Sequence, residues 1–296
     1  MIEVKDLTLT YPSGKGIFDV SFTVRQGEIM GYLGPNGAGK TTTIRALMGF
    51  MYPDRGTASI NGLDCWSKAT EIQRFLGYIP GEIAFPDGMS GDEFLKLMHD
   101  MRGTKDTKLQ NRLLEMFELD PKGKIKRFSK GMKQKLGIVA AFMHDPQVLV
   151  LDEPTSGLDP LMQNRFVDLV LSEKQRGKTI LMSSHIFEEV EKTCDNVLII
   201  KEGRIVVHSD VQTLKASQRK GYVIRTKEAG AMVQALQAAG FEAGIVTEDA
   251  VEVFIIAQDA DRFIKTISGF TIMDLDVKSQ TLEEVFMQFY SREGER

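Results

Sequence analysis

The sequence has little that would build a disulfide framework, a zinc site or a membrane span. Its 296 residues include only two cysteines, Cys65 and Cys194, with neither CxxC nor CxxH spacing, so a reducing cytoplasm suits the chain. A spanning helix needs about 20 apolar residues, and uncharged, mostly apolar stretches such as Gly137–Met143 are much shorter. The N-terminus also lacks the charged and apolar regions of a signal peptide. We therefore expect no segment of this chain to cross a membrane.

The chain also lacks an excess of positive charge. Its 37 basic and 41 acidic residues give a net charge of −4, which argues against a general nucleic-acid binder. A hydrophobic content of 42% and a charged content of 26% are ordinary for a globular protein and exclude disorder over most of the length. One local exception is Pro121–Lys135, with seven basic residues and no acidic one. Such a run usually forms a solvated face.

Strands and helices alternate over the first two hundred residues, which predicts an α/β domain with a parallel sheet covered by helices. The predicted strands are Ile2–Thr10, Gly16–Val24, Glu28–Leu33, Arg74–Pro80, Val148–Leu151, Thr179–Met182 and Val197–Lys201. The predicted helices are Thr41–Phe50, Gly91–Met101, Ser129–Met143, Pro160–Lys174 and Ile186–Cys194. A mostly helical insert is expected at about 86–145, where Ser90 and Glu93 form a capping box.

Composition changes at the polar, basic stretch Leu214–Gly221, which is typical of a linker. We therefore predict a first domain over 1–214 and a small accessory α+β domain over 215–296. The predicted order βαββαβα makes a ferredoxin-like unit one candidate for the second domain. Its strands are Tyr222–Arg225, Ala243–Val246, Val251–Ile256 and Ile272–Val277, and its helices are Ala229–Ala239, Ala260–Ile267 and Leu282–Tyr290.

A phosphate-binding loop is predicted between the strand Glu28–Leu33 and the helix after it. The residues match the pattern GxxxxGK[ST]: Gly34, Pro35, Asn36, Gly37, Ala38, Gly39, Lys40 and Thr41, followed by Thr42. The glycines let successive backbone N–H groups and the helix N-terminus point at phosphate oxygens. Lys40 supplies charge for the β- and γ-phosphates, and the Thr41 hydroxyl is placed to ligate magnesium. The sequence therefore predicts binding of a nucleoside triphosphate.

A second site follows the apolar strand Val148–Leu151. Asp152 at its end is a candidate magnesium ligand, and Glu153 is placed to polarise an attacking water as general base. His185 follows another apolar strand, where its side chain could reach the γ-phosphate, although a lone histidine at a strand end is more often structural.

Taken in order, these motifs resemble the ATP-binding cassette (ABC) ATPases. The stretch Phe128–Gln134 resembles the family signature LSGGQ, Ser156–Asp159 its D-loop, His185 its switch histidine and Tyr11 the aromatic residue that stacks on adenine. The resemblance covers about residues 1–214. It implies a P-loop NTPase core with a helical subdomain, a catalytic role for Glu153 and His185, and nucleotide contacts from Tyr11, Ser129, Gly131 and Asp159.

The sequence departs from the family pattern at two places. Lys130 replaces the second signature glycine, and the usual glutamine comes later, as Gln134. After Gly77–Pro80 the family usually has a glutamine that contacts magnesium, whereas this chain has Gly81 and then Glu82. Glu82 is therefore a candidate magnesium contact, with a different charge and a position offset by one residue.

The resemblance also implies partners. In this family ATP holds two cassettes head to tail, so each ATP would lie between the Gly34–Thr42 loop of one protomer and Ser129–Met132 of the other, in a homodimer or a heterodimer. A cassette without a spanning segment resembles the energy subunit of a transporter. The resemblance implies that it lies at the cytoplasmic face of the plasma membrane, and that its permease is a separate integral membrane chain. Ile83–Met101 is the candidate docking face. Local core is an equal alternative for its apolar residues, which are Phe85, Phe94, Leu95 and Met98. GYIPGE, SKGMKQ and the tail Thr281–Phe286 resemble bacterial efflux cassettes for drugs or antimicrobial peptides, which favours export.

Two competing classes of protein remain at this point, and the role of the C-terminal unit is also open. A soluble non-transport cassette ATPase, acting in repair, translation or assembly, would share every ATP motif. A P-loop GTPase would need an NKxD motif, which is absent, and a small-molecule kinase would not need the Ser129–Gln134 signature. The C-terminal unit could be a regulatory ligand-binding domain or a dimerisation prop, and its lack of a catalytic constellation favours the prop.

Overall fold

The computed structural model describes residues 1–216 and 220–279 and divides the chain into two compact units, Met1–Asp210 and Val211–Arg296. The division falls four residues before the predicted boundary at Leu214. The predicted linker Leu214–Gly221 was wrong at both ends, because helix α8 (Val211–Ala216) and strand β11 (Lys220–Arg225) enter it. Val211 and Leu214 are buried one helical turn apart, and this apolar spacing accounts for the helix.

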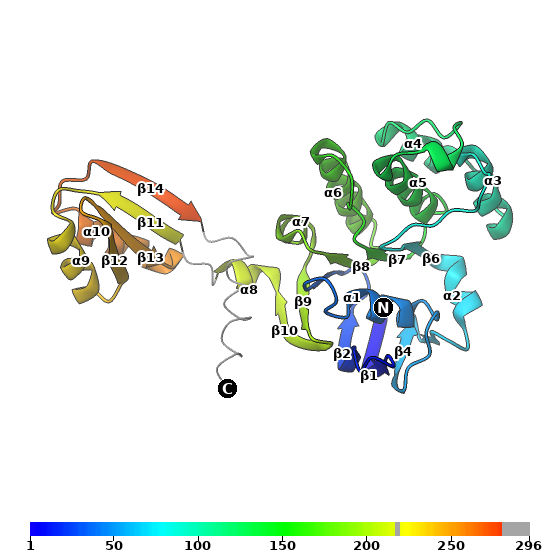
Figure 1. Cartoon of the computed structure of the whole chain (residues 1–296), viewed down its shortest axis with the longest axis horizontal. Helices are drawn as coiled ribbons and strands as arrows, with labels where there is room; N and C mark the ends of the chain where they lie inside the picture. The colour runs from blue at the N-terminus through cyan, green and yellow to red at the C-terminus, as the bar shows by residue number, and fades with distance from the viewer. Residues whose placement is uncertain (217–219, 280–296) are drawn as a thin grey trace. The chain divides into compact units, whose positions relative to one another are not determined.

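A six-stranded sheet forms the centre of the first unit (Figure 1). Its strand order is β10-β9-β3-β8-β7-β6, and all neighbours are parallel except β10 and β9. The strands are β3 (Ile29–Leu33), β6 (Leu76–Ile79), β7 (Val148–Asp152), β8 (Thr179–Ser184), β9 (Asn196–Lys201) and β10 (Arg204–Asp210). Every residue of β3, β7 and β8 is buried, as expected for a parallel sheet covered on both faces. The predicted parallel α/β core is confirmed.

The first two predicted strands do not join this sheet. A turn over Tyr11–Lys15 pairs β1 (Ile2–Thr10) with β2 (Gly16–Val24) in an antiparallel hairpin. A second sheet of order β2-β1-β4-β5 results, with β4 (Arg55–Ile60) and β5 (Leu63–Asp64). These two strands pair with each other because a short turn can join only antiparallel neighbours. The sequence patterns also did not predict β4, β5, β10 and helix α2 (Ala69–Phe75).

Helix α1 (Lys40–Leu47) begins directly after the phosphate loop and contacts β2, β4 and β7. Its apolar side chains share one core with both sheets of the unit. The buried Thr43 hydroxyl donates to the carbonyl of Gly39 at 3.0 Å, so the Tyr32 hydroxyl, also at 3.0 Å, is left to donate to Thr43. This chain of bonds holds the start of α1 against β3.

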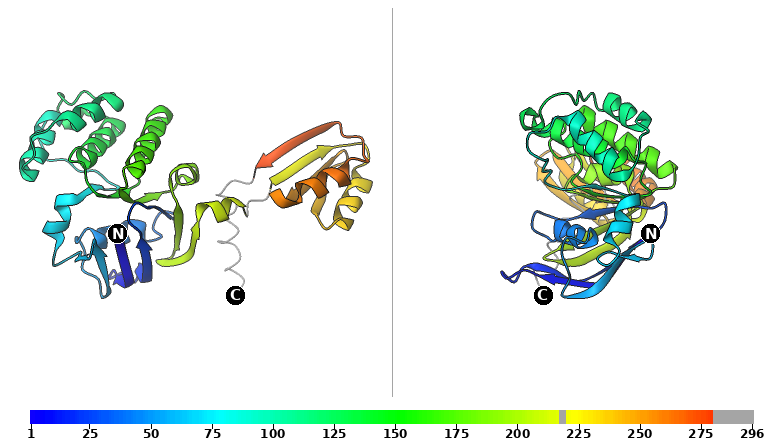
Figure 2. Two further views of the ribbon diagram at one scale, coloured as in Figure 1. Left: turned by 180° about the vertical axis from the view of Figure 1, so that it is seen from behind. Right: turned by 90° about the vertical axis from the view of Figure 1, so that its right-hand side faces the viewer.

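Four helices pack over the side of the central sheet that faces away from the antiparallel sheet (Figures 1 and 2). They are α3 (Gly91–Arg102), α4 (Lys108–Met116), α5 (Lys130–Phe142) and α6 (Pro160–Gln175). The predicted capping box of α3 is confirmed, with Glu93 N at 3.3 Å from Ser90 Oγ and Ser90 N at 2.6 Å from Glu93 Oε2. The short helix α7 (Phe187–Thr193) links β8 to β9.

The second unit has the strand order β12-β13-β11-β14, which is ferredoxin-like. Its strands are β11, β12 (Glu242–Thr247), β13 (Ala250–Ile255) and β14 (Asp274–Ser279). Helices α9 (Ala229–Ala238) and α10 (Ala260–Ile267) share a core with β11, β12 and β13. The predicted helix Leu282–Tyr290 lies outside the described residues. Within the described residues, no helix is both long and apolar enough to cross a bilayer.

Candidate functional site

The loop between β3 and α1 has the backbone that phosphate binding requires. Gly37 and Gly39 have φ values of 81° and 116°, which residues with a Cβ rarely adopt. A Cβ on Gly39 would also lie 2.8 Å from Ile17, and one on Gly34 would lie 2.5 Å from the carbonyl oxygen of Ile200. Conformation therefore favours glycine at 37, space requires it at 34, and both apply at 39.

Lys40 is the charged centre of this loop and is only 5% exposed. Its Nζ donates to the carbonyl oxygens of Gly34 at 2.6 Å and Pro35 at 3.3 Å, and it lies 3.6 Å from Glu153 Oε1. Buried charges need such partners because desolvation is costly. A bound phosphate would offer the same ammonium a stronger, charge-assisted partner.

Asp152 at the end of β7 is completely buried. Its Oδ1 accepts a hydrogen bond of 2.5 Å from Ser183 Oγ on the adjacent strand β8, whereas its Oδ2 is buried without any partner. A Cβ on Gly81 would lie 3.0 Å from Oδ2, so the chain passes close to this oxygen with its smallest residue. An unsatisfied carboxylate oxygen is what a cation or its bound water would complete.

Glu153 lies between Lys40 and His185. Its Oε1 faces Lys40 Nζ, and its Oε2 is 3.2 Å from Nδ1 of His185. Its φ of 48° lies in the left-handed region, a strained conformation that is concentrated at functional sites. Its N–H is held between the carbonyl oxygen and the Oγ of Ser183, at 3.2 and 3.0 Å. The structure thus brings Lys40 and His185 to the two carboxylate oxygens of Glu153, the residue after Asp152.

Tyr11 lies beside the start of α1. Its hydroxyl is 3.4 Å from Thr42 Oγ1 and 3.3 Å from the sulfur of Met51, and the ring is half-buried. Its stacking on adenine stays a prediction.

Ser129, Gly131 and Asp159 form a second cluster. Ser129 caps α5 by accepting from Met132 N at 3.2 Å, and Asp159 caps α6 by accepting from Met162 N at 3.0 Å. A Cβ on Gly131 would lie 2.8 Å from the carbonyl oxygen of Gly157, so the start of α5 touches the loop that leads into α6. In the described part of the chain, neither Ser129 nor Asp159 bonds to the Gly34–Thr42 loop.

Lys130 and Gln134, the two signature departures, contact the neighbouring loop. The stem of Lys130 packs on Gly157, where a Cβ would meet it at 3.0 Å. The buried Gln134 donates to the carbonyl oxygen of Pro154 at 2.7 Å, one residue after Glu153. Helix α5 is therefore tied to the loop that carries Glu153.

Gly81 is the residue that lies next to Asp152 Oδ2, whereas the side chain of Glu82 is exposed. Over residues 1–216 and 220–279 there is also no group of three His, Cys, Asp or Glu side chains arranged to hold a metal ion. A magnesium contact by Glu82 stays a prediction. Ser183, in contrast, was missed, although it lies in the same SSH tripeptide as His185.

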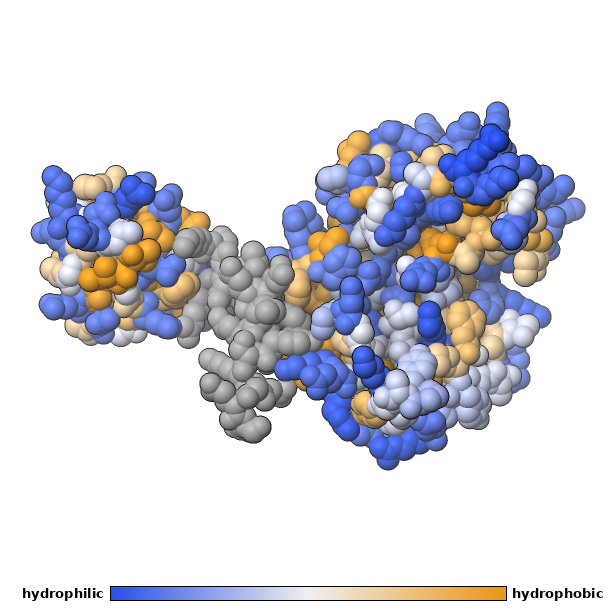
Figure 3. Space-filling model, viewed as in Figure 1, coloured by the Kyte–Doolittle hydropathy of each residue, from blue (hydrophilic) through white to orange (hydrophobic). Residues whose placement is uncertain are grey.

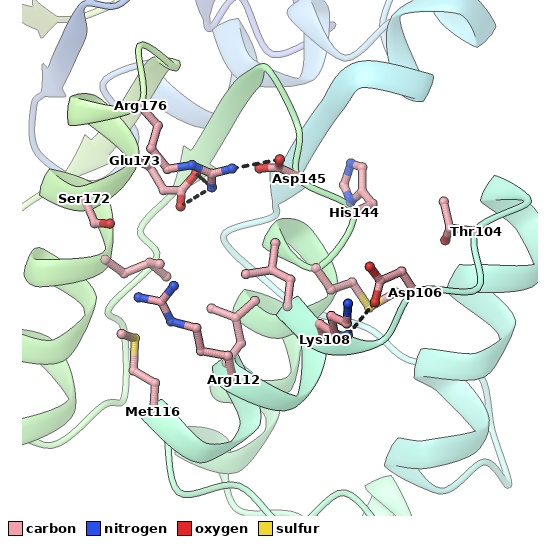
Figure 4. Close-up of a pocket in the computed structure, with 14 residues that line it drawn as sticks. Thr104, Asp106, Lys108, Arg112, Met116, His144, Asp145, Ser172, Glu173 and Arg176 are labelled. Carbon is pink, nitrogen blue, oxygen red and sulfur yellow. Dashed lines mark hydrogen bonds and ion pairs between the residues drawn. The ribbon is translucent and has the colours of Figure 1, made fainter.

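A cavity of about 530 Å³ lies elsewhere in the first unit, between α4, α6 and the loop before β7 (Figure 4). Arg176 bonds Glu173 and Asp145 across its wall. Burial lowers the pKa of His144 in this wall to about 4, so the ring is neutral at pH 7. The cavity holds none of the predicted site residues, and the phosphate loop rather than the cavity marks the chemistry.

Comparison with known proteins agrees with this geometry. Residues 17–156 match the model of the ABC transporter family. The chain is 34% identical to the ABC transporter ATP-binding protein NatA of Bacillus subtilis (72% of this chain, 90% of NatA). It is 39% identical to the bacitracin transport ATP-binding protein BcrA of Bacillus licheniformis (74% and 73%).

Solved structures give the same result. An ATP-binding subunit of an ABC transporter is 35% identical, with a TM-score of 0.68, over 73% of this chain and 92% of that chain. A dimeric bacterial ABC cassette is 21% identical with a TM-score of 0.66, over 71% of this chain and 99% of that chain, and supports the fold alone.

Replacing Ser183 with alanine tests the support of the two carboxylates. We expect Ser183→Ala to lower the free energy of unfolding by about 1–3 kcal/mol, because Asp152 loses its hydrogen bond inside the core. ATP turnover should fall as well, because Glu153 loses one of its two backbone anchors. Urea denaturation and an ATPase assay measure both effects. Ser172→Ala, on α6, is the control and should change stability by less than about 0.5 kcal/mol; equal effects would contradict the assignment.

Proposed function

The chain belongs to the ABC transporter family as an ATP-binding subunit, and from this premise we propose that it powers export through a separate permease in the membrane. The single observation that carries the ATP-hydrolysing part of this proposal is the cluster of Lys40, Glu153 and His185 at the carboxyl edge of the central sheet. The protein is an ATPase, and the proposal assigns the roles of its residues.

The roles follow from the geometry. The backbone N–H groups of Gly34–Thr41 and the ammonium of Lys40 hold the β- and γ-phosphates of ATP. Glu153 accepts the proton of the attacking water, and His185, in contact with Oε2, orients Glu153 and reaches towards the γ-phosphate. Magnesium, bound by Thr41 and Asp152, would neutralise phosphate charge. The partnerless Oδ2 of Asp152 suits that ion.

A second protomer completes the site in this proposal. Ser129 is exposed at the start of α5, and it does not reach its own phosphate loop within the described chain. Lys126, Arg127 and Lys130 are exposed next to it and add positive potential for a phosphate of the partner. ATP would therefore bridge the Gly34–Thr42 loop of one copy and Ser129–Met132 of the other, and hydrolysis would release the pair.

The docking face for the permease is narrower than Ile83–Met101. Leu95 is 1% exposed and belongs to the core of the protein. Phe85 and Phe94 stack edge to face at 4.9 Å and are half-buried, and Met101 is 74% exposed. We propose that Phe85, Phe94 and Met101, together with the half-buried Met98, bind the permease at the cytoplasmic face of the membrane.

The direction of transport rests on the relatives. The relatives include a bacitracin transport protein and a linearmycin resistance protein, the latter 34% identical over 70% of this chain. These names favour export of a drug or antimicrobial peptide over import. They also favour transport over the alternative of a non-transport cassette ATPase.

We propose that the second unit acts as a dimerisation prop, that is, it stabilises the dimer. In its described part, no cluster of metal-ligating residues is present. It exposes several large apolar side chains, and orange patches mark its surface in Figure 3. They are Ile245, Val246, Ile264, Ile272, Met273, Leu275 and Val277. A binding role for a small regulatory ligand has no comparable support.

Removing the base tests the cycle. Glu153→Gln keeps the shape of the side chain but cannot take a proton, so we expect ATP turnover to fall by at least about 100-fold. ATP should still bind and should produce a stable dimer, measured by size-exclusion chromatography with light scattering. Glu248→Gln, an exposed site in the second unit, is the control. Unchanged turnover, or no dimer with ATP, would count against the proposal.

The same dimer measurement reports on the second unit. A Glu153→Gln chain that ends at Asp210 lacks the whole second unit, and it should form a weaker dimer if that unit stabilises the dimer. A dimer of unchanged stability would contradict that role.

Copurification tests the permease. We expect the full chain to copurify from detergent-solubilised membranes of its source with a polytopic membrane protein. Met101→Glu should lower the yield of that protein by at least about fivefold, because a charge is costly in an apolar interface. Its ATPase rate should stay within about twofold of the original. Tyr52→Glu, at a side chain 79% exposed to which no role is assigned, is the control. Absence of a membrane partner would favour the non-transport alternative.

A further inference from the structure

Glu189 is a buried acidic residue that has no part in the site described above. It lies on α7 and is 6% exposed. Within residues 1–216 and 220–279, only Asp152 and Glu189 keep a buried carboxylate oxygen without a hydrogen bond. Burial of a carboxylate is costly unless it is compensated, so packing alone does not account for an acid at this position.

Ser184 connects Glu189 to the turn after β8. The Ser184 Oγ lies 3.0 Å from Oε2 of Glu189 and accepts a hydrogen bond of 2.9 Å from the N–H of Ile186. The carbonyl oxygen of Ile186 is also near, at 3.3 Å, but a hydroxyl has one hydrogen and the carboxylate is the closer acceptor. Because α7 has no side-chain cap at Ile186, this contact pins the turn.

The pinned turn carries His185. The side chain of His185 is 54% exposed, so packing does not hold it, and its contact within the site is the 3.2 Å approach to Glu153. Successive residues of a strand face opposite sides, so Ser183 supports Asp152 while Ser184 turns towards α7. Thr155, two residues after Glu153, is 3% exposed and lies beside the Glu189 carboxyl.

We infer that Glu189 is a positioning residue for ATP hydrolysis: through Ser184 it fixes the turn that holds His185 against Glu153. The inference rests on the roles proposed for Glu153 and His185. Burial raises the pKa of the Glu189 carboxyl, and the nearby Glu188 acts in the same direction, whereas Thr155, Ser184 and His185 lower it. Oε2 can accept from Ser184 whether the carboxyl is charged or neutral. Positioning therefore requires an acceptor oxygen and not a negative charge.

The test compares variants that keep or remove this acceptor. Glu189→Ala and Ser184→Ala each break the contact, and we expect each to lower kcat for ATP by about tenfold, since small displacements of catalytic groups are costly. KM for ATP should stay within about twofold, because the phosphate loop is untouched. Glu189→Gln retains an acceptor oxygen and should keep kcat within about threefold. Glu188→Ala, an exposed neighbour on the same helix, is the matched control and should behave as the unmodified protein.

Thermal unfolding of each variant is measured together with the kinetics to separate a loss of stability from a loss of activity. Ser184→Ala removes the contact without opening a large cavity. A kcat unchanged in both alanine variants, or an equal loss in Glu189→Gln and Glu189→Ala, would overturn the inference. A loss expressed mainly in KM would do the same. His185→Ala tests the premise separately: if it keeps the original kcat, the proposed role of His185 fails. If it loses activity while both alanine variants keep theirs, only the role of Glu189 fails.

Discussion

A buried positive charge at the carboxyl edge of the central sheet is the constraint on which the site depends. Lys40 is almost wholly buried. Its ammonium donates hydrogen bonds to two carbonyl oxygens of its own loop and faces the carboxylate of Glu153. A phosphate that enters the loop competes with all three partners. Glu153 is then freed from Lys40 while His185 still contacts its other oxygen. In this account, binding of the nucleotide also releases the base for catalysis.

The described chain contains two half-sites that do not bond to each other. One is the phosphate loop with Asp152 and Glu153, and the other is the pair of helix starts capped by Ser129 and Asp159. Gln134 ties the signature helix to Pro154, directly after Glu153, and Lys130 packs on Gly157. A movement of the signature helix would therefore act on the loop that carries Glu153, the proposed base of the same chain. This linkage gives the two active sites of a dimer a physical reason to work together.

Motifs with a local physical signal were predictable from the sequence. The phosphate loop follows from glycine spacing, α3 from its capping box, and β7 from an apolar run that ends in two acids. The antiparallel sheet was missed because pairing partners such as β1 and β4 are about fifty residues apart, and alternation does not identify the partner. Ser183 and Glu189 were missed for a similar reason: their roles depend on bonds to neighbouring elements and leave no motif. The loop after β6 shows the same limit, since only the structure places Gly81 rather than Glu82 against Asp152.

The central claim is that ATP is shared between the phosphate loop of one copy and the signature of another. Asn36→Cys and Ser129→Cys place one exposed thiol in each half-site. The native Cys65 and Cys194 give little background, because burial raises the pKa of each thiol to about 12. The measurement mixes the two variants, each also carrying Glu153→Gln, and follows disulfide-linked dimers on a non-reducing gel. The account predicts a cross-link only in the mixture and only with ATP. A cross-link without ATP, or none with it, would contradict the account.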